Sequence, residues 1–193
     1  MPEEIELNTE DVDERVHEAV ERRADWLLKA IALTTAVLAT IAAVAALRAG
    51  ATVNEALMLK TEAARLQSEA ADQWAYYQAK GIKSAVQEAS RAAWLAAGKE
   101  PPANVDAAIK QFWNEQGEIE KIARAKERDR DVKSAEGDRL FDQHHRYAMS
   151  VAIFQMAIAL GAVAALTRLR WVWIGSLILG FGGTAIFLAT WLR

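Results

Sequence analysis

Apolar residues along the chain fall into three long stretches without a charged residue, at 30–47, 147–167 and 171–192. A helix needs about 20 mostly apolar residues to cross the hydrocarbon core of a bilayer. The pattern therefore predicts transmembrane helices over 27–47, 147–167 and 171–192. Lys29 lies one turn inside the first of them, where a lysine can extend its ammonium group to the lipid headgroups.

Two other interpretations of the first stretch fit less well. Buried helices of soluble domains seldom run so long without charge. A cleaved signal peptide begins with basic residues, whereas residues 1–26 contain three Arg and ten Asp or Glu. We therefore expect a retained signal anchor, preceded by an acidic amphipathic cytoplasmic segment at 1–26.

The segment between the first two spans, residues 48–146, is polar and rich in helix-forming residues. Residues 51–97 and 104–146 contain no proline, and between them lies GKEPPA at 98–103, which favours a helix stop and restart. Because the two runs have similar lengths, we expect an antiparallel helical hairpin, coiled-coil-like, with its turn near 98–103. The predicted fold is an all-α membrane protein with three transmembrane helices and this hairpin between spans one and two.

The first run carries an apolar stripe with an eleven-residue rhythm, which favours a nearly straight or slightly right-handed coil. The stripe consists of Leu59, Ala63, Leu66, Ala70, Trp74, Tyr77, Gly81 and Ala85. The second run is charged on all sides at 126–131, and a turn centred near residue 100 sets this block opposite Asp72 to Trp74. We expect ion pairs between Asp72 or Glu69 and Arg128 or Arg130; the alternative is a solvated face with no special role.

Basic residues near the short connections predict the orientation of the chain. The loop between spans two and three contains Arg168 and Arg170, and Arg15, Arg22, Arg23 and Lys29 precede or enter span one. With three spans these regions lie on one side. We therefore expect a cytoplasmic amino terminus, with the segment at 48–146 periplasmic or extracellular.

Charge and cysteine content exclude several classes of function. Residues 48–146 contain 16 Lys or Arg and 16 Asp or Glu, so this segment has no net charge and predicts no nucleic-acid partner. The chain has no cysteine, which excludes disulfides and cysteine-ligated metal. Mixed charge combined with apolar stripes is typical of a coiled-coil interaction surface.

Small residues recur at four-residue spacing inside spans two and three. Such spacing lets helices approach closely, either within one chain or between several. The residues are Ala157, Gly161 and Ala165 in span two and Ser176, Gly180 and Thr184 in span three. The middle of each span lacks Asp, Glu, Arg and His, which argues against a proton-coupled transporter.

Few residues suggest catalysis or a cofactor. Asp142, His144 and His145 precede span two, but adjacent histidines point about 100° apart on a helix and cannot chelate one ion together. The sequence contains no motif for a nucleophile elbow, a phosphate loop, a dinucleotide or a zinc protease. We therefore expect no enzyme activity, cofactor or metal; a redox or metal enzyme using His144 and His145 is the alternative.

Two segments resemble a bacterial family of unknown function. They are AGATVNEA at 49–56 and DQWAYYQAK at 72–80. Together with the acidic amino terminus, the Ala/Thr-rich first span and the two closing spans, they make the chain similar to the family catalogued as domain of unknown function 4337. This resemblance implies a bacterial inner-membrane protein and transfers no catalytic residue.

The second segment has physical content of its own, since Trp74 and Tyr77 lie on the apolar stripe with Gly81 one turn further on. They can dock a partner helix, or they can be core aromatics of the hairpin. The candidate interaction residues are Asp72, Gln73, Trp74, Tyr77, Lys80, Arg128 and Arg130. We expect a self-associating structural or interaction protein of the lipid bilayer that presents a periplasmic arm to a membrane-protein partner or another copy. A subunit of a channel or transport assembly is the alternative.

Overall fold

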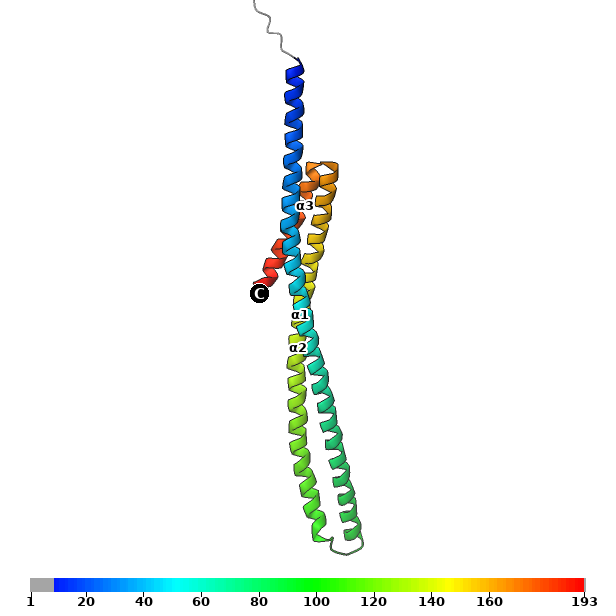
Figure 1. Cartoon of the computed structure of the whole chain (residues 1–193). Coiled ribbons are helices and arrows are strands. Elements are labelled where there is room, and N and C mark those ends of the chain that lie inside the picture. The colour runs from blue at the N-terminus through cyan, green and yellow to red at the C-terminus, as the bar shows by residue number, and fades with distance from the viewer. Residues whose placement is uncertain (1–8, 193) are drawn as a thin grey trace, which may run out of the picture. The chain divides into compact units, whose positions relative to one another are not determined.

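The computed structural model describes the backbone from Thr9 to Leu192 and the side chains from Asp25 to Leu192. Three α-helices make up this part of the chain: α1 (Thr9–Ala96), α2 (Ala103–Thr167) and α3 (Arg170–Trp191) (Figure 1). The side chains of the predicted amphipathic segment before Asp25 lie outside the described residues. Among the described residues no strand occurs.

Backbone chemistry explains the break between α1 and α2. Gly98 adopts a left-handed φ of +67°, and its N–H bonds to Leu95 O at 3.0 Å while that of Lys99 bonds to Trp94 O. Glycine adopts this conformation without steric cost, and such bonds satisfy the last carbonyls of a helix. Pro101 and Pro102 then prevent α1 from continuing, since proline lacks an N–H donor. The break lies within the stretch where the sequence predicted it.

Each of the three helices is long and apolar enough to cross a membrane. The chain divides into two compact units: unit 1 comprises residues up to Val53 and from Asp142 onward, and unit 2 comprises Asn54–Phe141. Unit 1 contains the three apolar stretches and unit 2 the charged segment between the first two.

The core of unit 1 is built from α1, α2 and α3 together. Its buried residues are Leu38, Ala42, Ala45, Ala49, Tyr147, Phe154, Ala157 and Phe187. Phe154 and Ala157 are completely buried, while α1 contributes mainly alanine. Because alanine side chains are short, α1 can pack closely against the aromatic residues Tyr147, Phe154 and Phe187 of α2 and α3. A second cluster, of Leu27, Ile31 and Ala164, packs against Val172 and Trp173.

Unit 2 consists of one segment of α1 and one of α2, which lie side by side in Figure 1 and are joined by the loop after Ala96. Side-chain contacts pair early positions of one with late positions of the other. Lys60 contacts Asp138 at 2.7 Å, Trp74 contacts Glu127 at 2.9 Å, and Arg91 contacts Asp106 at 2.8 Å.

Burial in unit 2 repeats every seven residues, not in the predicted eleven-residue rhythm. The inward positions of α1 include Ala56, Ala63, Ala70, Tyr77 and Ser84, and those of α2 include Val105, Phe112, Ile119, Lys126 and Lys133. The predicted stripe holds as far as Gly81, but Ala85 is exposed and Ser84 is buried in its place. The prediction was wrong there because it followed apolar residues, whereas the seven-residue repeat also takes a serine inward.

Candidate interaction surfaces

Trp74 and Tyr77, the predicted docking pair, pack against α2 of their own chain. Their rings meet edge to face with centroids 5.4 Å apart. Trp74 donates its indole N–H to Glu127 Oε1 at 2.9 Å, and the Arg124 guanidinium lies 5.6 Å from the Trp74 ring centroid. Cation–π contact adds attraction to this packing. The contacts favour the interpretation that these aromatics are core residues of unit 2.

Lys80 is the most enclosed of the ion-paired residues described in unit 2, with its side chain 13% exposed. Its ammonium group forms an ion pair with Glu115 and lies 5.1 Å from the Tyr76 ring centroid and 5.4 Å from that of Phe112. The hydrogen bond from Lys80 lowers the pKa of the Glu115 carboxyl, and the same bond raises the pKa of Lys80. Each partner therefore holds the other in its charged form.

Gly81 makes room for a second polar contact beside this pair. Gln116 donates its amide N–H to the backbone oxygen of Tyr77 at 3.1 Å. A Cβ atom at position 81 would lie 2.6 Å from Gln116 Nε2. Gly81 therefore leaves room for the hydrogen bond from Gln116 of α2 to Tyr77 of α1. The sequence had instead suggested that this glycine leaves a gap for a partner helix.

The charged block of α2 pairs with α1 through a different cation from those predicted. Glu69 pairs with Lys126 at 2.6 Å and also with Arg65 of its own helix. Arg130 hydrogen-bonds to Gln67 and pairs with its neighbour Asp131. The predicted pairs with Arg128 or Arg130 were wrong because Arg128 lies at an exposed position, while Arg130, although half-buried, is taken by Gln67 and Asp131.

The remaining predicted residues of unit 2 differ in exposure. Asp72 and Arg128 are exposed, and neither forms an ion pair with another residue in the range 25–192. Gln73 is half-buried at an inward position. The structure thus brings Trp74, Tyr77 and Lys80 together with α2 and leaves Asp72 and Arg128 on the surface.

The predicted small residues of unit 1 lie between helices of the same chain. Ser176 donates its hydroxyl hydrogen to Ala157 O at 2.7 Å, which joins α3 to α2. A Cβ atom added to Gly161 would lie 2.7 Å from Thr35 Oγ1, and one added to Gly180 would lie 2.6 Å from Leu38 Cδ2. Glycine at these positions lets both helices approach α1.

The outer members of the two small-residue series play lesser parts. Ala165 is half-buried against the second cluster of unit 1. The hydroxyl of Thr184 bonds to Gly180 O of its own helix at 2.8 Å, so this hydrogen bond does not join α3 to another helix.

A groove with small walls runs along α1 and α2 in unit 1, and sequence reasoning did not single it out. Its volume is about 530 Å³. Its lining is formed by Leu28, Ile31, Ala32, Thr35, Ala36 and Ala39 of α1 and by Gly161, Ala162 and Ala165 of α2. Exposed alanines continue along α1 at positions 43 and 46, so the row 32, 36, 39, 43, 46 has alternating steps of four and three. This regular spacing of alanines is the feature of the sequence from which the groove could have been predicted.

The histidines before the second apolar stretch have separate environments. His144 Nδ1 lies 2.8 Å from Ala49 O, and because a carbonyl only accepts, Nδ1 carries the hydrogen. His145 is exposed. Within the described residues no group of three His, Asp or Glu side chains converges as a metal site would require.

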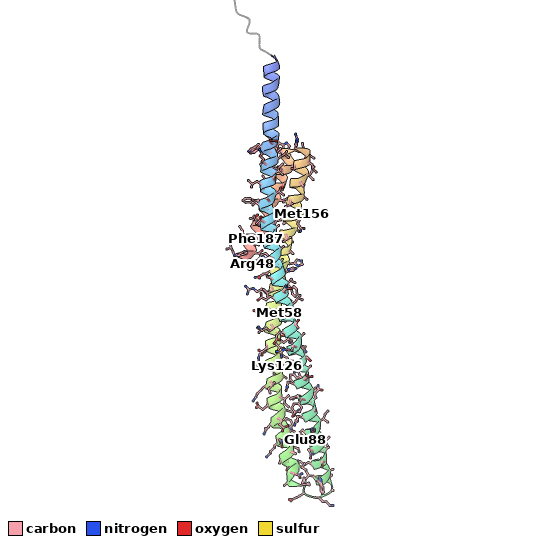
Figure 2. The ribbon with its side chains drawn as sticks, in the orientation of Figure 1. Arg48, Met58, Glu88, Lys126, Met156 and Phe187 are labelled. Carbon is pink, nitrogen blue, oxygen red and sulfur yellow. The ribbon has the colours of Figure 1, made fainter. Side chains whose placement is uncertain are left out.

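Aromatic residues flank the core of unit 1. Figure 2 labels Arg48 of α1 and Phe187 of α3, which lie near each other. The Arg48 guanidinium lies 4.0 Å from the Trp191 ring centroid, and Phe187 contacts both Trp191 and Tyr147. A second pair, Trp26 and Trp173, meets edge to face at 6.3 Å. Tryptophan and tyrosine are enriched where membrane proteins meet lipid headgroups.

Comparison with known protein families gives a match over most of the chain. The family described as "Domain of unknown function (DUF4337)" matches residues 27–193, which include all of unit 2 and most of unit 1. No curated protein and no solved structure matches the chain.

Proposed function

Since the chain belongs to the DUF4337 family, a family without an assigned activity, we propose from the residues themselves that it is a structural or interaction protein of a membrane. We propose no enzymatic activity for it. Unit 1 anchors it and associates with further copies, while unit 2 is presented outside the bilayer. The family resemblance suggests the bacterial inner membrane as its location, and the basic residues near α3 favour the orientation with unit 2 in the periplasm.

Large apolar side chains on the surface of unit 1 support its placement in lipid. They include Leu33, Leu47, Leu166, Trp171, Ile178, Phe181 and Leu192, each more than 65% exposed. Soluble monomers rarely expose contiguous apolar patches larger than a few hundred Å². In hydrocarbon the same side chains carry no such penalty, so a bilayer is the solvent that suits this surface.

Unit 2 has the surface of a water-exposed element. We interpret it as an antiparallel hairpin of coiled-coil type, because its inward positions repeat every seven residues on both helices. Its inter-helix contacts include ion pairs such as Lys60–Asp138 and Arg91–Asp106. Exposed and half-exposed ion pairs of this kind suit water and would be costly in hydrocarbon.

The groove of unit 1 is the observation that carries the proposal of self-association. The glycines and serine that close the contacts among α1, α2 and α3 are already in use inside the chain. Ala32, Ala36 and Ala39 remain on the surface and, with Ala162, form part of the apolar lining of the groove. Small side chains favour helix association in membranes because they let helix backbones approach closely, so we assign this groove to a helix of another copy.

Filling the groove tests the proposal. We expect the purified chain to run as an oligomer in detergent and in nanodiscs. Ala36→Leu places a branched side chain in the groove and should shift the mass to that of a monomer. Ala185→Leu makes the same change at an exposed position of α3 outside the groove and should leave the mass unchanged. A monomeric wild-type particle, or equal masses for both variants, would contradict the proposal.

The alternative of a channel subunit finds less support in unit 1. Gly180 faces Leu38 inside the three-helix packing, and the Thr34 hydroxyl bonds to Ala30 O of its own helix. Gly180 is therefore enclosed by the packing of this chain and is not available to line a pore. Ion flux through liposomes containing the protein would reverse this preference.

A further inference from the structure

The outward face of α1 in unit 2 carries an apolar stripe that the packing of unit 2 leaves unused. Its members are Ala75, Ala79, Ile82, Val86, Ala89 and Ala93, all exposed. Ile82 is 67% exposed and Val86 is 60% exposed. The steps between members are 4, 3, 4, 3 and 4, and no charged residue interrupts them. We refer to these six residues as the outer stripe.

The outward face of α2 shows what a solvated face of the same unit looks like. Its exposed positions include the polar or charged residues Gln111, Asn114, Glu118, Lys121 and Arg128, while exposed apolar residues such as Trp113 and Val132 occur singly among them. Helices that face only water normally carry such residues. The outer stripe therefore differs from its surroundings in both composition and regularity.

Alternating steps of three and four are the spacing of a coiled-coil seam. An apolar helix face with this spacing can bury itself against another helix only when that helix runs alongside it. We propose that the outer stripe packs against the same stripe of a second copy, in parallel, so that unit 2 contributes a second interface to the self-association proposed for unit 1. The inference rests on that proposed function.

The size of the outer stripe favours another copy over a soluble protein. At 1.5 Å per residue, the 19 residues from Ala75 to Ala93 span roughly 28 Å, and a face about 10 Å wide gives roughly 300 Å² per partner. Stable complexes formed from solution bury about 800 Å² per partner. A copy already held in the same membrane meets the stripe at high effective concentration, so a smaller area suffices.

Charge and membrane attachment favour the parallel arrangement. Copies anchored in one membrane with the same orientation direct their arms the same way. In a parallel seam Lys83, which flanks the outer stripe, lies across from Gln78 of the other copy, whose amide oxygen can accept a hydrogen bond. An antiparallel overlap of the whole stripe would set the two Lys83 side chains beside each other, which costs energy.

The absence of cysteine from the chain permits a direct test by disulfide formation. Single cysteines are introduced at each position from 78 to 90 in the full-length protein in native membranes, and oxidised dimers are measured. A disulfide needs Cα atoms about 4.4–6.8 Å apart. We expect several-fold more dimer at 79, 82, 86 and 89 than at the positions between them. Asn114→Cys and Lys121→Cys, on the outward face of α2, serve as matched controls and should give little dimer.

A uniform yield along 78–90, or more dimer at the α2 controls, would overturn the inference. The mass of the cysteine-free protein separates this failure from that of the proposed function. A monomeric protein contradicts both proposals, whereas an oligomer without periodic dimer formation contradicts only the outer stripe.

A second variant guards against cysteines that disturb packing. Ile82→Glu with Val86→Glu places charges on exposed positions and should leave the helicity by circular dichroism unchanged. It should lower disulfide formation at Ala79→Cys and Ala89→Cys several-fold. Unchanged dimer formation in this background would also overturn the inference.

Discussion

At the scale of single residues, the packing of unit 1 depends on glycine and serine at the points where its helices meet. Gly161 and Gly180 leave room for Thr35 and Leu38 of α1, and the Ser176 hydroxyl bonds to an α2 carbonyl. Each contact brings two helix backbones close together, where dispersion forces between many atoms add up. The three-helix packing is therefore sensitive to single added methyl groups.

Gly180→Ala and Gly182→Ala form a matched pair for this sensitivity. At Gly180 the new methyl group meets Leu38, which is buried, whereas at Gly182 it meets nothing within 4 Å. Both variants gain up to about 1 kcal/mol of helix propensity. Overpacking costs about 1–3 kcal/mol, so we expect Gly180→Ala to unfold at lower temperature in detergent than Gly182→Ala. Equal midpoints would mean that Leu38 moves aside freely.

At the scale of elements, unit 2 places polar residues among the apolar ones at positions that the proposed coiled coil would usually fill with apolar side chains. Gln73, Lys80, Lys126 and Lys133 lie at inward positions of the seven-residue repeat. Lys80 and Lys126 each find a carboxylate on the facing helix. Polar residues at such positions fix register, because a slip leaves a charge without its partner. We expect the pairing of α1 with α2 to be specific in register.

Acidification tests the pair of Lys80 and Glu115. The folded state lowers the pKa of the Glu115 carboxyl below its ordinary value of 4.5. The unfolded chain therefore binds this proton more readily, and the stabilisation present above pH 4.5 is lost as the pH falls through the lowered pKa. The raised pKa of Lys80 acts in the opposite sense, and its contribution is lost only in strong base.

We expect Glu115→Gln to reduce the acid-dependent part of the unfolding of unit 2. Helicity by circular dichroism of the full-length protein in detergent, recorded between pH 3 and 7 with added denaturant, measures it. Glu118→Gln is the control, since Glu118 pairs with Lys121 within a single exposed turn. The same loss of pH dependence in both variants would show that the pair with Lys80 has no special part.

At the scale of the whole molecule, the chain combines two units with different surfaces. Unit 1 exposes large apolar side chains, whereas unit 2 is rich in ion pairs on and between its helices. Such surfaces suit different solvents, and the proposed function assigns them to lipid and to water. The two proposed interfaces, the groove of unit 1 and the outer stripe of unit 2, lie on separate units and can be tested separately.

Single-cysteine labelling tests the proposed placement across the membrane. Lys121→Cys in unit 2 and Leu169→Cys between α2 and α3 are both exposed positions. In spheroplasts, a membrane-impermeant maleimide should label Lys121→Cys at once and Leu169→Cys only after permeabilisation. The opposite pattern would reverse the orientation, and equal labelling before permeabilisation would contradict placement across a membrane. The cysteine-free parent gives the background.

The amino-acid sequence by itself determined the helical class, the three apolar helices and the break near Gly98. These features depend on composition and local backbone chemistry, which a linear pattern records directly. Proline and glycine act through their own dihedral angles, and a run of 20 apolar residues is visible without knowing its neighbours.

Only the tertiary structure decided which residues meet. It placed Lys126 rather than Arg128 or Arg130 opposite Glu69, turned Ser84 inward in place of Ala85, and engaged Trp74 with Glu127. Helix register depends on how whole rows of side chains interlock. Two registers that differ by a few residues fit the sequence pattern almost equally well, yet they give every side chain a different partner. For the same reason the alanine groove and the outer stripe became visible only when burial showed which small residues the chain had already used.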